Sequence, residues 1–152
     1  MKCKICGAKS LLFGNTKISG KYFVDYYYCS VCGFMQTEAP YWLAESYSST
    51  ITKSDVGLIS RNLIMAEKTK NFILLCLDPG QRFVDYGGGY GLFTRRMRDI
   101  GFDFYHYDPL CKNLFAEGFE ASLHETYSLV TAWEVLEHLV DPLTDIRKML
   151  DF

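Results

Sequence analysis

The chain has 152 residues, of which 49% are hydrophobic and 22% are charged, and its formal net charge is −2. This composition excludes a disordered chain and predicts a packed globular core. The slight acidic balance argues against a large phosphate-binding surface, and therefore against nucleic acid as a partner.

No run of residues is apolar for long enough to span a bilayer, so no membrane contact is expected. Residues 1–4 lead directly into cysteines and polar residues instead of a secretory signal. We therefore expect a cytoplasmic protein. In that reducing compartment, six cysteines indicate metal ligands and buried thiols rather than disulfides.

The first predicted segment, residues 1–36, carries two matching knuckles of the form Cys-x-x-Cys-Gly. Their cysteines are Cys3, Cys6, Cys29 and Cys32. A two-residue gap lets two thiolates converge on one tetrahedral ion, and the glycine permits the tight turn beside them. We predict a zinc ribbon, in which four sulfurs close a structural Zn²⁺ site. Short β-like runs at 11–13 and 22–28 fit a hairpin between the knuckles.

The second segment, residues 37–77, is predicted to hold a linker and a helix. Pro40 and a Ser/Thr cluster indicate an ordered linker over residues 37–53. Apolar residues then recur mostly at three- or four-residue spacing, which predicts a helix over residues 54–77. Asp78-Pro79-Gly80 ends that helix.

The third segment, residues 78–152, alternates between strand and helix patterns. Strands are predicted at 82–86, 102–107, 119–123 and 129–133, and helices at 92–100, 110–117 and from about Pro142. This alternation predicts an α/β fold with a Rossmann-like doubly wound parallel sheet. Because the sheet is incomplete at Phe152, we expect either a fragment or a fold completed by something else. Its open edge predicts self-association.

A glycine-rich loop follows the first of these strands. Its sequence is Asp85-Tyr86-Gly87-Gly88-Gly89-Tyr90-Gly91-Leu92. The third glycine of a dinucleotide fingerprint falls on Leu92, so that fingerprint is not met. An acid two residues before the first glycine suits a cationic ligand, such as a sulfonium or ammonium group. Asp108, at the end of the next strand, lies near the offset at which a carboxylate receives ribose hydroxyls. Asp108 also suits a helix N-cap before Pro109.

Residues 82–145 resemble class I S-adenosylmethionine-dependent methyltransferases. Residues 84–91 resemble the first motif of that family, Asp108 matches its ribose-binding acid, and residues 129–142 resemble its fourth-strand segment. The paired knuckles, followed by Pro40 and Tyr47, resemble zinc-containing methyltransferases of glycan and secondary-metabolite pathways. The resemblance implies S-adenosylmethionine as cofactor and a small-molecule or sugar-like acceptor. It implies cofactor contacts from Asp85, Tyr86, Gly87, Gly88, Gly89, Gly91, Asp108 and Trp133. Ser122 and Glu125 are the weak candidates for holding the adenine.

Glu134 and His138 are the predicted catalytic residues, because they lie just past the carboxyl end of a strand and can accept a proton from the acceptor. If the segment were helical, Glu134, Glu137 and His138 would share one face and could bind Mg²⁺ or Mn²⁺. We favour a pocket-shaping role, because no further ligand is found. His106 and His124 receive no role.

Two further functions remain open from the sequence. A truncated methyltransferase domain with its ribbon could serve as a non-catalytic scaffold or binding module. Alternatively, the ribbon could guide an RNA-directed methyltransferase, although the acidic balance weighs against it.

Overall fold

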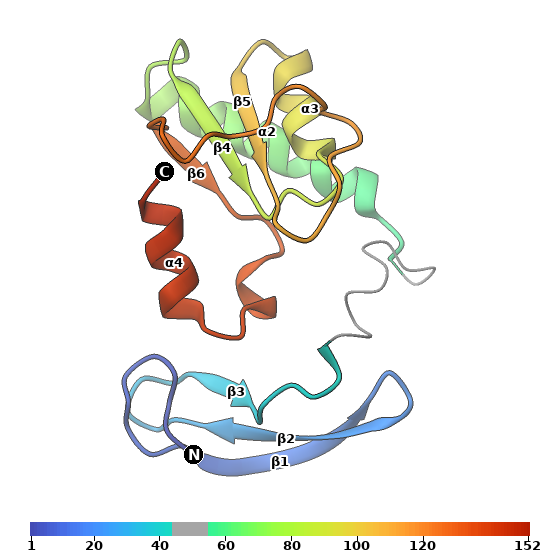
Figure 1. Ribbon diagram of the computed structural model, residues 1–152, viewed down its shortest axis with the longest axis vertical. Coiled ribbons are helices and arrows are strands. Elements are labelled where there is room, and N and C mark those ends of the chain that lie inside the picture. The colour runs from blue at the N-terminus through green and yellow to red at the C-terminus, as the bar shows by residue number, and fades with distance from the viewer. Residues whose placement is uncertain (44–54) are drawn as a thin grey trace. The chain divides into compact units, whose positions relative to one another are not determined.

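The structure, a computed structural model, describes residues 1–43 and 55–152. The chain divides into two compact units, a β unit that carries the paired cysteines and an α/β unit (Figure 1). None of the helices in these described ranges is long and apolar enough to cross a membrane.

The β unit is a three-stranded antiparallel sheet in the order β1-β2-β3. Its strands are β1 (Leu11–Ile18), β2 (Tyr22–Tyr28) and β3 (Met35–Thr37). Both predicted β-like runs lie in these strands, which confirms the hairpin between the knuckles. Val24 is fully buried, whereas its neighbour Phe23 is exposed, as the alternation of a strand requires.

The buried side chain of Gln36 fastens the first knuckle to β3. Its Oε1 accepts a hydrogen bond from Lys4 N at 2.8 Å, and its Nε2 donates to Lys2 O at 2.9 Å. The predicted segment boundaries at residues 36 and 77 stay predictions. Of the predicted linker over 37–53, residues 44–53 lie outside the described residues, as does Tyr47.

The predicted helix of the second segment is α2 (Leu58–Cys76). It begins after Gly57, whose φ of 95° is not helical, and thus later than the predicted start at residue 54. Its buried positions, Ala66, Thr69 and Ile73, recur at three- and four-residue spacing.

The α/β unit contains a parallel sheet in the order β5-β4-β6. The strands are β4 (Arg82–Tyr86), β5 (Asp103–Tyr107) and β6 (Leu129–Thr131), with α3 (Leu92–Asp99) between β4 and β5 in the chain. A short 3₁₀ helix, η1 (Leu136–His138), and α4 (Pro142–Leu150) follow β6. This is the expected α/β fold with an incomplete Rossmann-like sheet. Self-association through a sheet edge stays a prediction.

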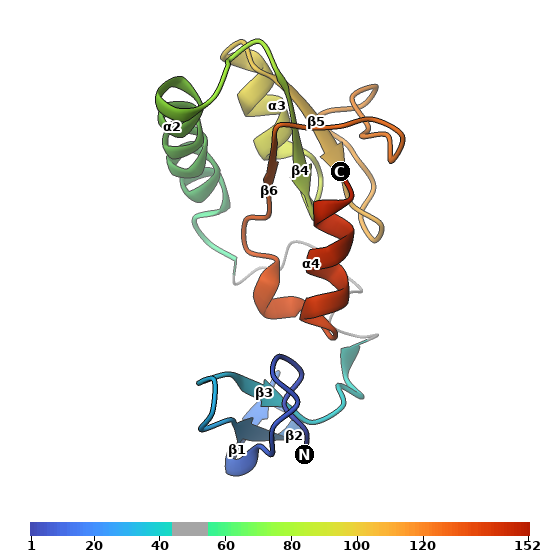
Figure 2. The same ribbon diagram turned by 90° about the vertical axis from the view of Figure 1, so that its left-hand side faces the viewer.

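Aromatic and apolar side chains bury both faces of this sheet. On one face, Phe83 and Phe104 are fully buried and pack with residues of α2 and α3, so both helices lie on that side (Figure 2). On the other face, Tyr86 and Tyr107 pack on the buried ring of Phe152, at centroid distances of 6.0 and 4.9 Å.

Several predicted elements of the third segment differ from the structure in type or extent. The helix predicted at 110–117 is irregular, because Leu114 N and Phe115 N donate to Tyr90 O instead of to carbonyls one turn back. Asn113 also bonds both the N–H and the C=O of Ala116, so local side-chain bonds replace a helix. The strand predicted at 119–123 is only a parallel bridge between His106 and Glu120, and the last predicted strand ends early, at Thr131.

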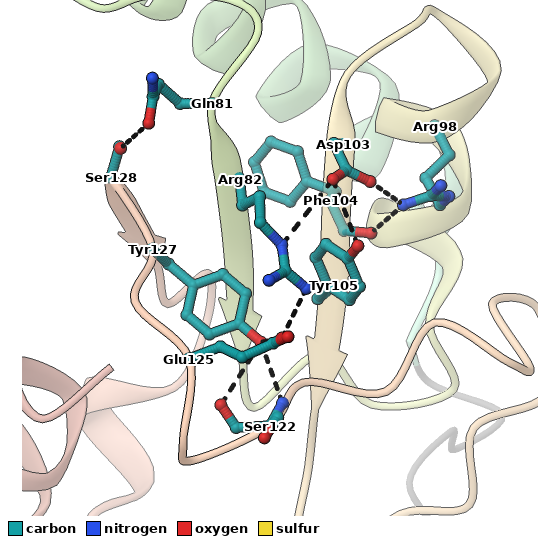
Figure 3. A network of polar contacts seen from close by, with 10 residues as sticks. All are labelled: Gln81, Arg82, Arg98, Asp103, Phe104, Tyr105, Ser122, Glu125, Tyr127 and Ser128. Carbon is teal, nitrogen blue, oxygen red and sulfur yellow. Dashed lines mark hydrogen bonds and ion pairs between the residues drawn. The ribbon is translucent and has the colours of Figure 1, made fainter.

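A polar network ties the first residues of β4 and β5 to the segment before β6 (Figure 3). Arg82 donates to Glu125, and its guanidinium lies 4.5 Å from the ring centroid of Tyr105. The hydrogen bond from Arg82 lowers the pKa of the Glu125 carboxyl. Ser122 N donates to the hydroxyl of Tyr127. Glu125 and Ser122 thus take part in a network that holds the sheet together, and their contact with adenine stays a prediction.

Candidate cofactor site and metal centre

The glycine loop connects β4 to α3 at the carboxyl end of the sheet, and four of its glycine N–H groups are engaged within the protein. Gly87 N and Gly88 N donate to Tyr107 O, and Gly91 N donates to Gly88 O. Gly89 N donates to Asp108 Oδ2 at 2.9 Å. A phosphate cradle depends on outward-pointing N–H groups. These four glycine N–H groups point to other protein atoms, so the loop is not arranged to receive a pyrophosphate.

Packing explains why the loop needs glycine. A Cβ on Gly88 would lie 2.6 Å from Asp85 Oδ2, and one on Gly87 would lie 2.6 Å from Val135 Cγ2. Gly87 also has a φ of 71°, which disfavours other residues. The contact with Val135 brings the segment after β6 against the glycine loop.

Asp85 is only 2% exposed and lies beneath the loop. Its Oδ1 accepts a hydrogen bond of 2.8 Å from Thr131 Oγ1. Burial raises the pKa of the Asp85 carboxyl to about 7, the Thr131 hydroxyl opposes that shift, and the charge of Asp108 adds to it. A cation above the loop would stabilise the ionised carboxylate.

Asp108 holds the turn that follows β5. Its Oδ1 accepts hydrogen bonds from Leu110 N and Cys111 N, both at 2.8 Å. The helix N-cap predicted for Asp108 is wrong, because these bonds hold an irregular segment and no helix follows it. Each carboxylate oxygen can accept more than one hydrogen bond, so ribose hydroxyls remain compatible with this arrangement.

A cavity of about 310 Å³ lies beside Asp108. Its lining carries more acidic than basic side chains and consists of His106, Tyr107, Asp108, Cys111, Lys112, Asn113, Glu117, Glu120 and Ala121. Together with buried Asp85, this lining gives the site a negative balance. Such a balance disfavours a ligand with two phosphates and suits one with a positive charge.

Tyr86 and Trp133, two further residues predicted to contact the cofactor, lie in different surroundings. Tyr86 is buried in the aromatic cluster with Tyr107 and Phe152, opposite the face of Asp85. Trp133 is 38% exposed, and its ring centroid lies 6.2 Å from that of Phe93 in α3. The structure thus keeps Trp133 near the glycine-loop helix and turns Tyr86 away from it.

The segment after β6 carries the predicted catalytic pair. Glu134 and His138 are both exposed, and Glu134 has a φ of 56°, which no helical residue adopts. Glu137 and His138 belong to η1, whereas Glu134 does not. The helical premise of a divalent metal site was therefore wrong. Among the described residues, the metal-compatible group found is the cysteine cluster alone.

The four predicted cysteines of the β unit converge. Their sulfur atoms all lie within 4.8 Å of one another, and the Cys3–Cys32 and Cys6–Cys29 sulfur pairs are each 3.5 Å apart. Four sulfurs at Zn–S bonds of about 2.3 Å would be about 3.8 Å apart in a tetrahedron. The cluster could therefore hold a metal ion whose bonds to sulfur have this length.

The two knuckles repeat one backbone pattern. Cys3 N donates to Ala8 O and Gly7 N donates to Cys3 O, and the same bonds join Cys29, Phe34 and Gly33. Both glycines have positive φ, 73° and 77°. A hydrogen bond from the Cys6 backbone lowers the pKa of the Cys3 thiol to about 6, despite its burial. This favours the thiolate form that a metal requires.

A family model described as a methyltransferase domain matches residues 60–152, which is more than half of the chain. The chain belongs to the methyltransferase family. The matched residues comprise the glycine loop, Asp108 and the segment after β6, and thus the motifs on which the class I resemblance rested. No curated protein matches this methyltransferase chain.

Three residues that hold the site were missed by the sequence reasoning. Thr131 bonds Asp85, Asn113 supports the segment beside Gly91, and His106 contacts the loop itself. His106 carried a signal, because residues two apart in a strand share a face and Asp108 is two residues on. The partners of Thr131 and Asn113 lie far apart in the sequence or in an irregular segment, and no local pattern marks them.

Proposed function

We propose that this methyltransferase uses S-adenosylmethionine to methylate a small-molecule or sugar-like acceptor. One observation carries the choice of cofactor. The glycine N–H groups are satisfied within the protein, while Asp85 and the acidic cavity lining supply negative charge at the same edge of the sheet. A phosphate-rich dinucleotide would meet a lining with more acidic than basic side chains, and the four glycine N–H groups are already bonded to protein atoms.

The described residues fit this cofactor. Asp108 is in a position to receive ribose hydroxyls beside the cavity, and Asp85 offers a negative field beneath the loop for the positive groups. When bound, the cofactor supplies a sulfonium-linked methyl group that is already activated for transfer. The protein then contributes alignment of the acceptor and exclusion of water.

Glu134 and His138 are the residues we assign to the acceptor side. Both are exposed on the segment that Val135 packs against the glycine loop. A carboxylate or imidazole there can take the proton that a hydroxyl or carbon acid loses when it is methylated. We further propose that the four-cysteine cluster binds Zn²⁺ as a structural ion, because four sulfurs leave no open position for substrate.

The test is product formation by the full-length, zinc-loaded protein. S-Adenosylhomocysteine release is measured with S-adenosylmethionine and a panel of hydroxylated small molecules and sugars, with total RNA as a separate arm. Turnover with a small acceptor supports the proposal, and Glu134→Gln and His138→Ala should reduce it. Turnover with RNA alone would replace the proposed acceptor class with the RNA-directed alternative.

A further inference from the structure

Gly89, in the middle of the glycine loop, is held on both sides by the side chains of His106, in β5, and of Asp108, which directly follows β5. Its N–H donates to Asp108 Oδ2, and its C=O lies 2.9 Å from His106 Nε2. Because a carbonyl oxygen can only accept, the Nε2 atom of His106 must carry the hydrogen. The two peptide groups that flank Gly89 are therefore both fixed in orientation.

The end of β5 makes this double hold possible. His106 lies in β5 and Asp108 follows its last residue, Tyr107, and both side chains reach Gly89. His106 is also the register partner of Asp85 on β4, and it is only 3% exposed. A Cβ on Gly88 would lie 2.9 Å from His106 Cδ2, so the loop rests directly on the imidazole ring.

The backbone of His106 holds a second part of the site. Its N–H donates to Phe119 O and its C=O accepts from Ala121 N, both at 2.8 Å. Ala121 lines the cavity beside Asp108, and so does His106 itself. One residue of β5 therefore bonds both the glycine loop and the segment in which Ala121 lines the cavity.

We propose that His106 is a positioning residue, which fixes the glycine loop for cofactor binding through its Nε2–H bond to the Gly89 carbonyl. This inference rests on the proposed function of the loop as the cofactor site. It assigns to His106 a role that depends on the N–H donor and not on the volume of the ring. Loss of the donor leaves the Gly89 carbonyl of the loop without its partner, and the loop then samples other peptide orientations.

Two substitutions separate the donor from the ring. His106→Phe keeps a planar ring and removes the N–H, whereas His106→Gln keeps an N–H donor at a similar reach. His124→Phe, at an exposed histidine outside the site, is the matched control. Each full-length, zinc-loaded variant is measured by calorimetric titration with S-adenosylhomocysteine, by hydrogen–deuterium exchange of residues 87–91 without ligand, and by thermal unfolding.

We expect His106→Phe to weaken binding about tenfold or more and to speed exchange of the loop by a similar factor, since one hydrogen bond is lost. His106→Gln should stay within about threefold of the wild type in both measurements. The inference is overturned if His106→Phe leaves loop exchange unchanged, or if His106→Gln is as impaired as His106→Phe. Hydrogen–deuterium exchange of the loop is measured without ligand, so it tests the positioning role of His106 even if the wild type binds no S-adenosylhomocysteine. Absence of binding by the wild type would count against the proposed function and not against the role of His106.

Discussion

Replacing Asp85 by Asn should stabilise the protein at alkaline pH. The carboxyl is buried, and burial moves its pKa from 3.8 to about 7. Asn has nearly the same shape, keeps an oxygen for the hydroxyl of Thr131 and carries no charge. The substitution therefore removes the free-energy cost of ionising a buried acid.

The magnitude follows from proton linkage. Between pH 3.8 and about 7 the folded protein binds more protons at Asp85 than the unfolded chain does, so this residue lowers stability as the pH rises through that window. The cost levels off above the folded pKa. Between about pH 5.5 and about pH 8 the added cost is about 2 kcal/mol. For a chain of this size, that corresponds to about 4–8 °C in Tm.

Thermal unfolding of wild type and Asp85→Asn at both pH values is the assay. The Tm difference between variant and wild type should grow by about 4–8 °C from about pH 5.5 to about pH 8. Any free-energy cost of the new amide that does not depend on pH cancels when the Tm differences at the two pH values are compared. Asp99→Asn, at a surface ion pair with Arg95, is the control and should show little change. A pH-independent Tm difference for Asp85→Asn would refute the argument from burial.

Three further outcomes are expected. Cys29→Ser should lose the bound metal, measured by elemental analysis, whereas Cys76→Ser on α2 should keep it. S-Adenosylhomocysteine should protect Cys111, which lines the cavity, from alkylation more than it protects the exposed Cys76; equal protection of both would contradict the placement of the ligand. Gly88→Ala should lower both Tm and ligand affinity, because the added Cβ would lie 2.6 Å from Asp85 Oδ2. Gly80→Ala should change neither much, because its added Cβ would lie 3.4 Å from Asp78 Oδ1.

The features that the sequence predicted well depend on spacing along the chain. Two Cys-x-x-Cys-Gly knuckles can bring four sulfurs together whatever lies between them, and the structure does so. The positions of Asp85 and Asp108 follow from strands that end at one edge of a parallel sheet. Tyr86 could have been placed more accurately, because adjacent strand residues point to opposite faces and Asp85 already occupies the loop face.

The features that the sequence missed depend on contacts across the fold. The segment 110–117 has helical spacing, but hydrogen bonds to Tyr90 O and the side chain of Asn113 replace the helix. Glu134 adopts a positive φ, which its residue type does not predict. That conformation removes Glu134 from any helical face shared with His138, and with it the basis for a divalent metal site.

In the proposed function, the glycine loop, Asp85 and Asp108 form a site for S-adenosylmethionine. Calorimetric titration of the full-length, zinc-loaded protein with S-adenosylhomocysteine, with NAD as the competing ligand, tests it most directly. We expect saturable binding of S-adenosylhomocysteine that Asp108→Ala abolishes, and no binding of NAD. A folded protein that binds NAD, or that binds neither ligand, would contradict it.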